Sequence, residues 1–300
     1  MTETLAYLND RWVPCTALSL PIDDLGFLLG ATVVERMRTF SGSIFRLDDH
    51  LHRLRRSLEI VGWDTETICQ QVAEACSGFL RHNPALAQDG DDCYLVVFVT
   101  PGQTADASNP TVCIYGHPLP FHSWAKQYTS GVEAAIVDIR QVPAECWPAE
   151  LKCRSRMHYY LADQQAHARS PGAKAVLLDQ DGYVGEGTTA NIVAYYQDRG
   201  LVTPPRSKVL PGVSQQVLFE LADALQVPHS EADLLPEQLA AADEAFLTST
   251  SSCLLPIVRV DGQPLGTGKP GPMAQRLLHA WSELVGVDIA AQAGRFAASR

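Results

Sequence analysis

The chain has 300 residues, of which 46% are hydrophobic and 19% charged, as in ordinary soluble globular proteins and unlike disordered or collagen-like chains. Lysine and arginine number 23 and aspartate and glutamate 34, so the formal net charge is −11. An acidic surface repels phosphate backbones and anionic headgroups, and we therefore expect no nucleic-acid partner and no membrane partner. The length favours two domains.

The cysteines and the first residues indicate a cellular compartment. Eight cysteines occur without a CxxC pair, and the chain begins MTETLAYLND, without a basic-then-apolar leader. These features predict reduced thiols in a cytoplasmic protein. His50 and His52 would point to different faces of a helix, and no other group has metal-ligand spacing, so we expect no metal.

The first part of the chain mixes strand and helix patterns. Leucines recur at helical spacing from Leu47 to Leu58, behind two aspartates that can cap a helix. Proline-glycine and asparagine-proline pairs bound β-branched and aromatic runs, which predict strands. The expected elements, besides the leucine helix, are strands at 5–14, 43–47, 94–99 and 111–115 and a helix at about 65–82.

A segment rich in proline and aromatic residues, 116–124, separates this part from the rest. We place an interdomain linker at 121–131, between an N-terminal α/β domain (1–120) and a C-terminal α/β domain (132–300). The fold class is therefore α/β, of the α+β kind. The second part is expected to contain strands at 132–139 and 191–196, a hairpin at 176–184, and helices at about 155–168, 213–226 and 273–285.

Two residues of the second part suggest a cationic ring cofactor. Lys152 ends an extended, proline-containing segment just before a helix, where an amine can be held for imine chemistry. By position alone, a solvated surface lysine is the more usual case. Glu186 stands between two glycines at a strand end. Its carboxylate can approach a ring nitrogen closely, or it can be a turn residue in water.

Two further segments suggest that the cofactor is phosphorylated. Leu210–Ser214 opens a predicted helix whose first N–H groups, with the Ser214 hydroxyl, form a ready phosphate site; the alternative is a simply capped helix. Residues 248–252 are all serine or threonine and follow an apolar run. Five consecutive hydroxyl groups are more than a turn needs.

In their order along the chain, these motifs resemble the class IV aminotransferases, a pyridoxal-phosphate group that contains branched-chain and D-amino-acid aminotransferases and aminodeoxychorismate lyase. The resemblance covers nearly the whole chain. It implies a two-domain, fold type IV architecture with pyridoxal 5'-phosphate between the domains, and a homodimer. It rests on DLGFLLG at 24–30, FRLDDHLHRL at 45–54, Lys152, residues 181–192, LPGV at 210–213 and EAFLT at 244–248.

The resemblance also implies residue roles. Lys152 would form the Schiff base with the cofactor and then move the proton during catalysis. Glu186 would pair with the protonated ring nitrogen. Arg53 is assigned from the match at residues 50–53 and not from helical geometry. The implied phosphate ligands are Arg53, Val213, Ser214, Thr250 and Ser251.

The substrate pocket departs from both familiar patterns. Pro101 stands where D-amino-acid aminotransferases carry an arginine, and Val96 stands at the arginine of the branched-chain Tyr-x-Arg pattern. Arg38 matches the arginine of the branched-chain Glu-Gly-x-Arg pattern, so it is a candidate carboxylate ligand or a partner in a structural ion pair. Arg36 replaces the glycine of that pattern. Arg36 and Tyr159 are further candidate substrate contacts.

We therefore predict a pyridoxal-phosphate-dependent aminotransferase that moves an amino group between an α-amino acid and a 2-oxo acid such as 2-oxoglutarate. Branched-chain L-amino acids are favoured, because Phe27 and Val33–Val34 would suit an aliphatic pocket. Arg154 and Arg156 could anchor a carboxylate or pair with surface acids. A D-amino-acid aminotransferase, a lyase that releases pyruvate and a silent homologue remain alternatives.

Overall fold

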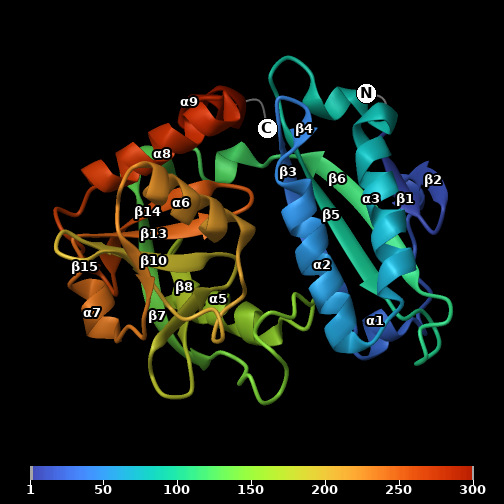
Figure 1. The fold of residues 1–300 in the computed structure, drawn as a ribbon, viewed down its shortest axis with the longest axis horizontal. Helices are drawn as coiled ribbons and strands as arrows, with labels where there is room; N and C mark the ends of the chain where they lie inside the picture. The colour runs from blue at the N-terminus through green and yellow to red at the C-terminus, as the bar shows by residue number, and fades with distance from the viewer. Residues whose placement is uncertain (1–2, 299–300) are drawn as a thin grey trace. The chain divides into compact units, whose positions relative to one another are not determined.

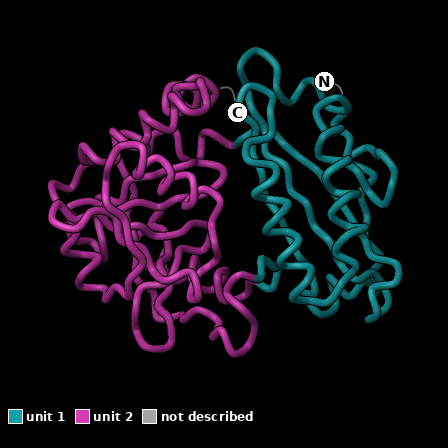
Figure 2. The backbone as a smooth tube through the Cα atoms, viewed as in Figure 1, with its two compact units in different colours: residues 1–119, 151–155 teal, residues 120–150, 156–300 magenta. Residues whose placement is uncertain are grey.

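A computed structural model describes residues 3–298 of the chain. Over these residues the chain forms two compact units, residues 1–119 with 151–155 (unit 1) and residues 120–150 with 156–300 (unit 2; Figure 2). This division differs from the expected one. Residues 121–131 belong to unit 2 because Phe121 and Tyr128 are buried there, and the Tyr128 hydroxyl donates to the carbonyl of Ser252 (2.8 Å). Residues 151–155 belong to unit 1.

Within the described residues, unit 1 holds a six-stranded sheet in the order β2-β1-β6-β5-β3-β4, with every neighbouring pair antiparallel. Its strands are β1 (Leu5–Leu8), β2 (Arg11–Pro14), β3 (Val33–Phe40), β4 (Ser43–Ile44), β5 (Cys93–Thr100) and β6 (Thr111–Pro118). Its helices are η1 (Cys15–Ala17), α1 (Leu25–Leu28), α2 (Leu47–Val61), α3 (Thr65–His82) and η2 (Pro84–Ala87).

Helices α2 and α3 lie across one face of this sheet (Figure 1). Because side chains alternate along a strand, the two helices cover every second residue of the sheet. Leu95 and Val97 of β5 join the core with Leu54 of α2. Tyr94 and Val96 face the other side of the sheet. The expected helices at 47–58 and 65–82 are confirmed. Gly62 ends α2 in the left-handed region (φ 74°), and the Asp64 carboxylate caps α3.

Two differences from the expected elements have a local cause. The strand expected at 43–47 is only the two-residue β4, because α2 already begins at Leu47. β3 was not predicted as a strand, because Glu35, Arg36 and Arg38 interrupt its apolar pattern. Its hydrogen bonds to β5 along the whole register nevertheless place it inside the sheet.

In the part of unit 2 that the structure describes, a nine-stranded sheet mixes parallel and antiparallel pairs, with β7 parallel to both β8 and β14. Its strands are β7 (Val132–Arg140), β8 (Lys174–Leu178), β9 (Val184–Gly187), β10 (Asn191–Tyr196), β11 (Gly200–Thr203), β12 (His229–Glu231), β13 (Glu244–Ser249), β14 (Cys253–Val260) and β15 (Gln263–Pro264). The hairpin expected at 176–184 is confirmed as the β8–β9 pair.

The helices of unit 2 cover this sheet through small and aliphatic residues. Ala162 and Ala166 of α5 pack on β7 and β8, while α6 and α8 contact each other and β13. The helices are η3 (Phe121–Ser123), α4 (Gln127–Ser130), α5 (Met157–Arg169), α6 (Val213–Ala224), α7 (Pro236–Ala240), α8 (Pro272–Val285) and α9 (Ile289–Ala297).

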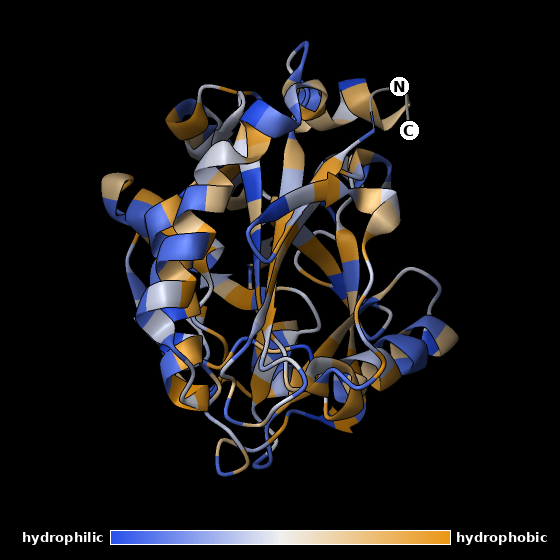
Figure 3. Ribbon diagram, turned by 90° about the vertical axis from the view of Figure 1, so that its right-hand side faces the viewer, coloured by the Kyte–Doolittle hydropathy of each residue, from blue (hydrophilic) through white to orange (hydrophobic). Residues whose placement is uncertain are grey.

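Hydropathy follows these layers. In Figure 3 the strands carry long hydrophobic runs, and the helices alternate between hydrophilic and hydrophobic residues, as expected for elements with one buried face. Among residues 3–298, no helix combines the length and the apolar character that a membrane span requires. The eight cysteines all lie in this range as free thiols, most of them buried.

Candidate active site

Lys152 is held at the edge of the unit 1 sheet. The N–H of Val34 on β3 donates to the carbonyl of Lys152 (2.9 Å), and the N–H of Arg154 donates to the carbonyl of Thr32 (2.9 Å). On its other side, the Lys152 N–H donates to the Ser57 hydroxyl of α2 (3.2 Å). The main chain of the segment that carries the amine is therefore fixed between a strand and a helix of the same unit.

A buried ion-pair cluster lies under this segment. The Arg53 guanidinium donates to both carboxylate oxygens of Glu35 (2.7 and 2.8 Å), and the His50 ring contacts Glu35 at 2.9 Å. Burial opposes the charge of Glu35, but Arg53 and His50 outweigh it and hold the pKa of Glu35 far below its usual range. Burial lowers the pKa of His50, and the charge of Lys152 lowers it further. The cluster positions Arg53, whose phosphate role stays a prediction.

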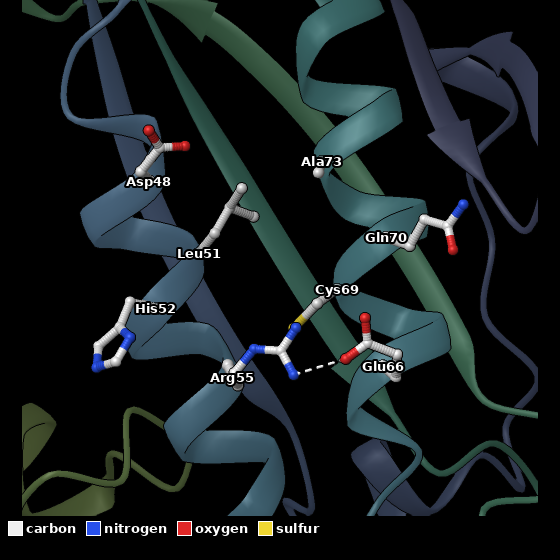
Figure 4. A pocket seen from close by; sticks show the side chains of 8 residues that line it. All are labelled: Asp48, Leu51, His52, Arg55, Glu66, Cys69, Gln70 and Ala73. Carbon is white, nitrogen blue, oxygen red and sulfur yellow. Dashed lines mark hydrogen bonds and ion pairs between the residues drawn. The ribbon is translucent and has the colours of Figure 1, made fainter.

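The neighbouring arginine of α2 has a different environment. Arg55 lines a pocket of about 350 Å³ between α2 and α3, where its guanidinium pairs with Glu66 at 2.8 Å (Figure 4). Both side chains are at the surface. Helical spacing alone could not distinguish Arg53 from Arg55, and the burial of Arg53 beside Glu35 separates them.

The two arginines of β3 also differ. Arg38 is 1% exposed, its Nε donates to the carbonyl of Thr39 (3.1 Å), and its guanidinium lies over the Phe40 ring (3.8 Å). This burial favours the structural alternative for Arg38 over a substrate contact. Arg36 is only half-buried and lies over the Tyr94 ring, 4.1 Å from its centroid.

In unit 2, Glu186 is buried on β9 with two donors around its carboxylate. The Tyr159 hydroxyl donates to Oε1 (2.6 Å), and the N–H of Leu210 donates to Oε2 (3.3 Å). Glu186 is thus no solvated turn residue. Tyr159 was expected as a substrate contact, but its hydroxyl is directed at Glu186, and the Arg156 guanidinium covers its ring at 4.5 Å.

Asn191 joins three parts of unit 2. On β10 it is paired with Glu186 of β9 and with Thr248 of β13. Its side-chain amide donates to the carbonyl of Leu210 (2.8 Å), and a Cβ on Gly212 would lie only 2.0 Å from its Oδ1. Glycine at 212 is required for this close approach, and Asn191 thereby fixes the loop that leads into α6 beside Glu186.

The start of α6 and the end of β13 each offer phosphate donors. Gly212 precedes the helix with no side-chain cap, so the first N–H groups of α6, at Val213 and Ser214, have no capping acceptor. Thr248 is 1% exposed, and its hydroxyl lacks a hydrogen-bond partner among the residues that the structure describes. Helix N–H groups and an unpartnered buried hydroxyl fit an anionic phosphate, and Glu186 nearby fits a cationic ring nitrogen.

Three contributors were absent from the sequence prediction. Ser57 holds the main chain of Lys152, Asn191 organises the α6 loop, and Tyr115 on β6 lies near Arg36. Asn191 stands in the motif at 181–192, so its position was available, although its role was not. No spacing rule connects Ser57 to Lys152 or Tyr115 to Arg36, because each pair is far apart in the chain.

Comparison with known proteins gives a consistent result. Residues 32–260 match the family model described as amino-transferase class IV. Among curated proteins, the branched-chain-amino-acid aminotransferase-like protein 2 of Arabidopsis thaliana is 27% identical over 286 residues, which cover 94% of this chain and 50% of that protein. This chain therefore spans about half the length of that relative.

Two further matches cover both chains almost completely. The D-alanine aminotransferase of Bacillus licheniformis is 26% identical over 276 residues, 90% of this chain and 93% of that one. The T.th. branched-chain amino acid aminotransferase, solved in complex with N-(5'-phosphopyridoxyl)-L-glutamate, superposes with a TM-score of 0.83 at 22% identity and covers 97% of this chain and 96% of that chain. The structural likeness confirms the fold, which is that of fold type IV enzymes.

Proposed function

The chain belongs to the class IV aminotransferase family, and from this premise we propose that it moves amino groups from branched-chain L-amino acids to 2-oxoglutarate. That it is a pyridoxal-phosphate-dependent aminotransferase follows from the family and its relatives. The observation that carries the proposal is Lys152, fixed between β3 and Ser57 within the segment that the family model matches.

The residues of this chain divide the work. Lys152 supplies the amine that holds the cofactor and later carries the proton of the substrate Cα. The cofactor, when bound, supplies the electron sink for that deprotonation. Glu186 would hold the proton on the ring nitrogen of the cofactor. The residues that the resemblance implies for the phosphate are Arg53, Val213, Ser214, Thr250 and Ser251.

The identity of the amino-donor substrate is the least constrained part of the proposed reaction. The branched-chain relative supports an aliphatic amino acid, and the D-alanine relative keeps the D-configuration as the second candidate. Phe27, expected in an aliphatic pocket, is mostly exposed, so Val34 on β3 is the better candidate for the pocket wall. We also propose that the protein is a cytoplasmic homodimer. This is a proposal of its own and is not transferred from the first relative, of whose length the chain spans half.

Half-reaction spectroscopy tests the proposal. Single L- and D-amino acids are added to the cofactor-loaded protein, and the decay of the visible cofactor band is followed. Fastest decay with L-leucine, L-isoleucine or L-valine supports the branched-chain assignment. Decay with D-amino acids only supports the second candidate. Release of pyruvate from a substrate without any amino acceptor would instead identify a lyase.

A further inference from the structure

The unit 1 sheet has a second face that α2 and α3 do not cover. Residues that oppose each other in an antiparallel pair point to the same face. Cys153 pairs with Val33, so Lys152 stands opposite Val34, and both share the face of Arg36. Lys152 and Arg36 are thus diagonal neighbours on one face, with Cα atoms about 7–8 Å apart.

The Arg36 guanidinium has no carboxylate partner among the described residues. Its Nε is buried without a hydrogen-bond partner, and within residues 3–298 no carboxylate forms an ion pair with it. Burial lowers the pKa of Arg36; the nearby Tyr94 and Tyr115 raise it, and the like charge of Arg154 lowers it further. The buried, unpartnered Nε of Arg36 can be satisfied by an oxygen of a bound anion.

A pocket lies on the same face of the sheet as Arg36. Tyr115 also lines a pocket of about 410 Å³ on this face, together with the Phe98 ring and apolar residues of β1 and of the segment after η1. The ring centroids of Tyr94 and Tyr115 lie 5.9 and 5.8 Å from that of His117, so the aromatic wall is continuous from Arg36 to the pocket.

The register shows what Arg36 replaces. Arg36 stands directly opposite Val96 on β5. Position 96 is the third of the Tyr-x-Arg pattern, where branched-chain enzymes carry an arginine and this chain carries valine. Directly opposed residues have Cβ atoms about 4.5–5.5 Å apart, so an arginine on β3 can present its guanidinium over the area that a β5 arginine would occupy. Glycine at position 36 could not do so.

We propose that Arg36 binds the distal carboxylate of a dicarboxylic 2-oxo acid or amino acid. The inference rests on the proposed aminotransferase function and names the substrate class of the same site. The α-carboxylate would remain next to the carbon that reacts at Lys152. The Arg36 guanidinium instead leans over Tyr94, which opposes Arg38 and so lies on the side away from Lys152. That offset suits a second carboxylate several bonds from the reacting carbon.

The test compares two acceptors of equal chain length, 2-oxoglutarate and 2-oxopentanoate, in the cofactor-loaded protein. Arg36→Met should lower the kcat/KM for 2-oxoglutarate relative to that for 2-oxopentanoate about 10- to 100-fold. A loss of this size corresponds to one charge-assisted bidentate hydrogen bond. Arg36→Lys should keep part of the ratio, because it keeps the charge. Arg55→Met, which removes a surface arginine paired with Glu66, is the matched control and should leave the ratio unchanged.

Binding without turnover gives a second readout. Calorimetry should show that glutarate binds the loaded wild-type protein more tightly than pentanoate does, and that Arg36→Met removes the difference. The exchange Arg36→Val with Val96→Arg should restore part of the preference, because the two positions face each other. If Arg36→Met changes neither the kcat/KM ratio nor glutarate binding, the inference about Arg36 is overturned. Amino transfer to 2-oxopentanoate in the same variant would still support the proposed function. A protein that transfers no amino group to either acid would refute the proposed function, and glutarate binding would still decide the role of Arg36.

Discussion

At the scale of single residues, Lys152 combines a reactive group with a rigid support. Its main chain makes hydrogen bonds to Val34 and Ser57, so an exchange of its side chain should leave the segment in place. We predict that Lys152→Ala abolishes turnover and the visible band of the bound cofactor. Absorbance and activity check this against Lys269→Ala, which removes an exposed lysine and should preserve both. Residual amino transfer at the wild-type rate in Lys152→Ala would exclude the assignment.

Glu35 is expected to affect stability through its buried ion pair with Arg53. Its folded-state pKa is lowered, so its contribution is fully present above the unfolded value of about 4.3 and is lost as the pH falls from there towards the folded value. Glu35→Gln leaves Arg53 buried without its carboxylate, and we predict a loss of about 3–5 kcal/mol in the free energy of unfolding at pH 7.

Urea unfolding at a series of pH values measures both parts of this prediction. The wild type should lose stability below about pH 4, and Glu35→Gln should lose less over the same range. Glu59→Gln, which alters an exposed pair with Arg56, should stay within about 0.5 kcal/mol of wild type. Equal stabilities of Glu35→Gln and wild type at pH 7 would contradict the buried ion pair.

At the scale of elements, the loop that leads into α6 depends on a strand residue. Asn191→Ala removes the donor to the Leu210 carbonyl and the contact at Gly212. An unsatisfied carbonyl and a loosened helix start should weaken cofactor binding about tenfold. Equilibrium dialysis of pyridoxal phosphate against the apoprotein measures this, with the exposed Asn109→Ala as control. Identical affinities for Asn191→Ala and wild type would show that the loop orders itself.

Elements also show what local sequence could predict. The leucine spacing of α2 and the aspartate–glycine turn of the β8–β9 hairpin, at 181–182, are local signals, and the structure confirms both elements. β3 carries charged residues whose burial depends on partners distant in sequence. Glu35 is tolerated inside unit 1 only because Arg53 and His50 face it from α2. A window of neighbouring residues contains no information about such a partner.

At the scale of the whole molecule, the apolar side chains of segment 22–29 of unit 1 are exposed to solvent in the single chain. Leu29 is 72% exposed, and Ile22, Phe27 and Leu28 are also largely exposed. A contiguous exposed apolar segment is typical of an interface. We predict a homodimer by light scattering, and a shift towards monomer in the double variant Leu28→Asp and Leu29→Asp. Leu284→Asp, an exposed leucine of α8, is the control and should remain dimeric. A wild-type protein that is monomeric at micromolar concentration would contradict the prediction.

The sequence by itself predicted the family and its cofactor chemistry, which are confirmed, and the role of Lys152, which stays a prediction. All three depend on motifs whose order along the chain is visible without a structure. Only the tertiary structure decided how the candidate residues are supported. Strand register placed Arg36 opposite Val96 and diagonal to Lys152. Burial distinguished the enclosed Arg38 from the half-buried Arg36, and the hydroxyl of Tyr159 was found to donate to Glu186. Motifs are read along the chain, whereas register and burial arise from segments that meet only when the chain folds.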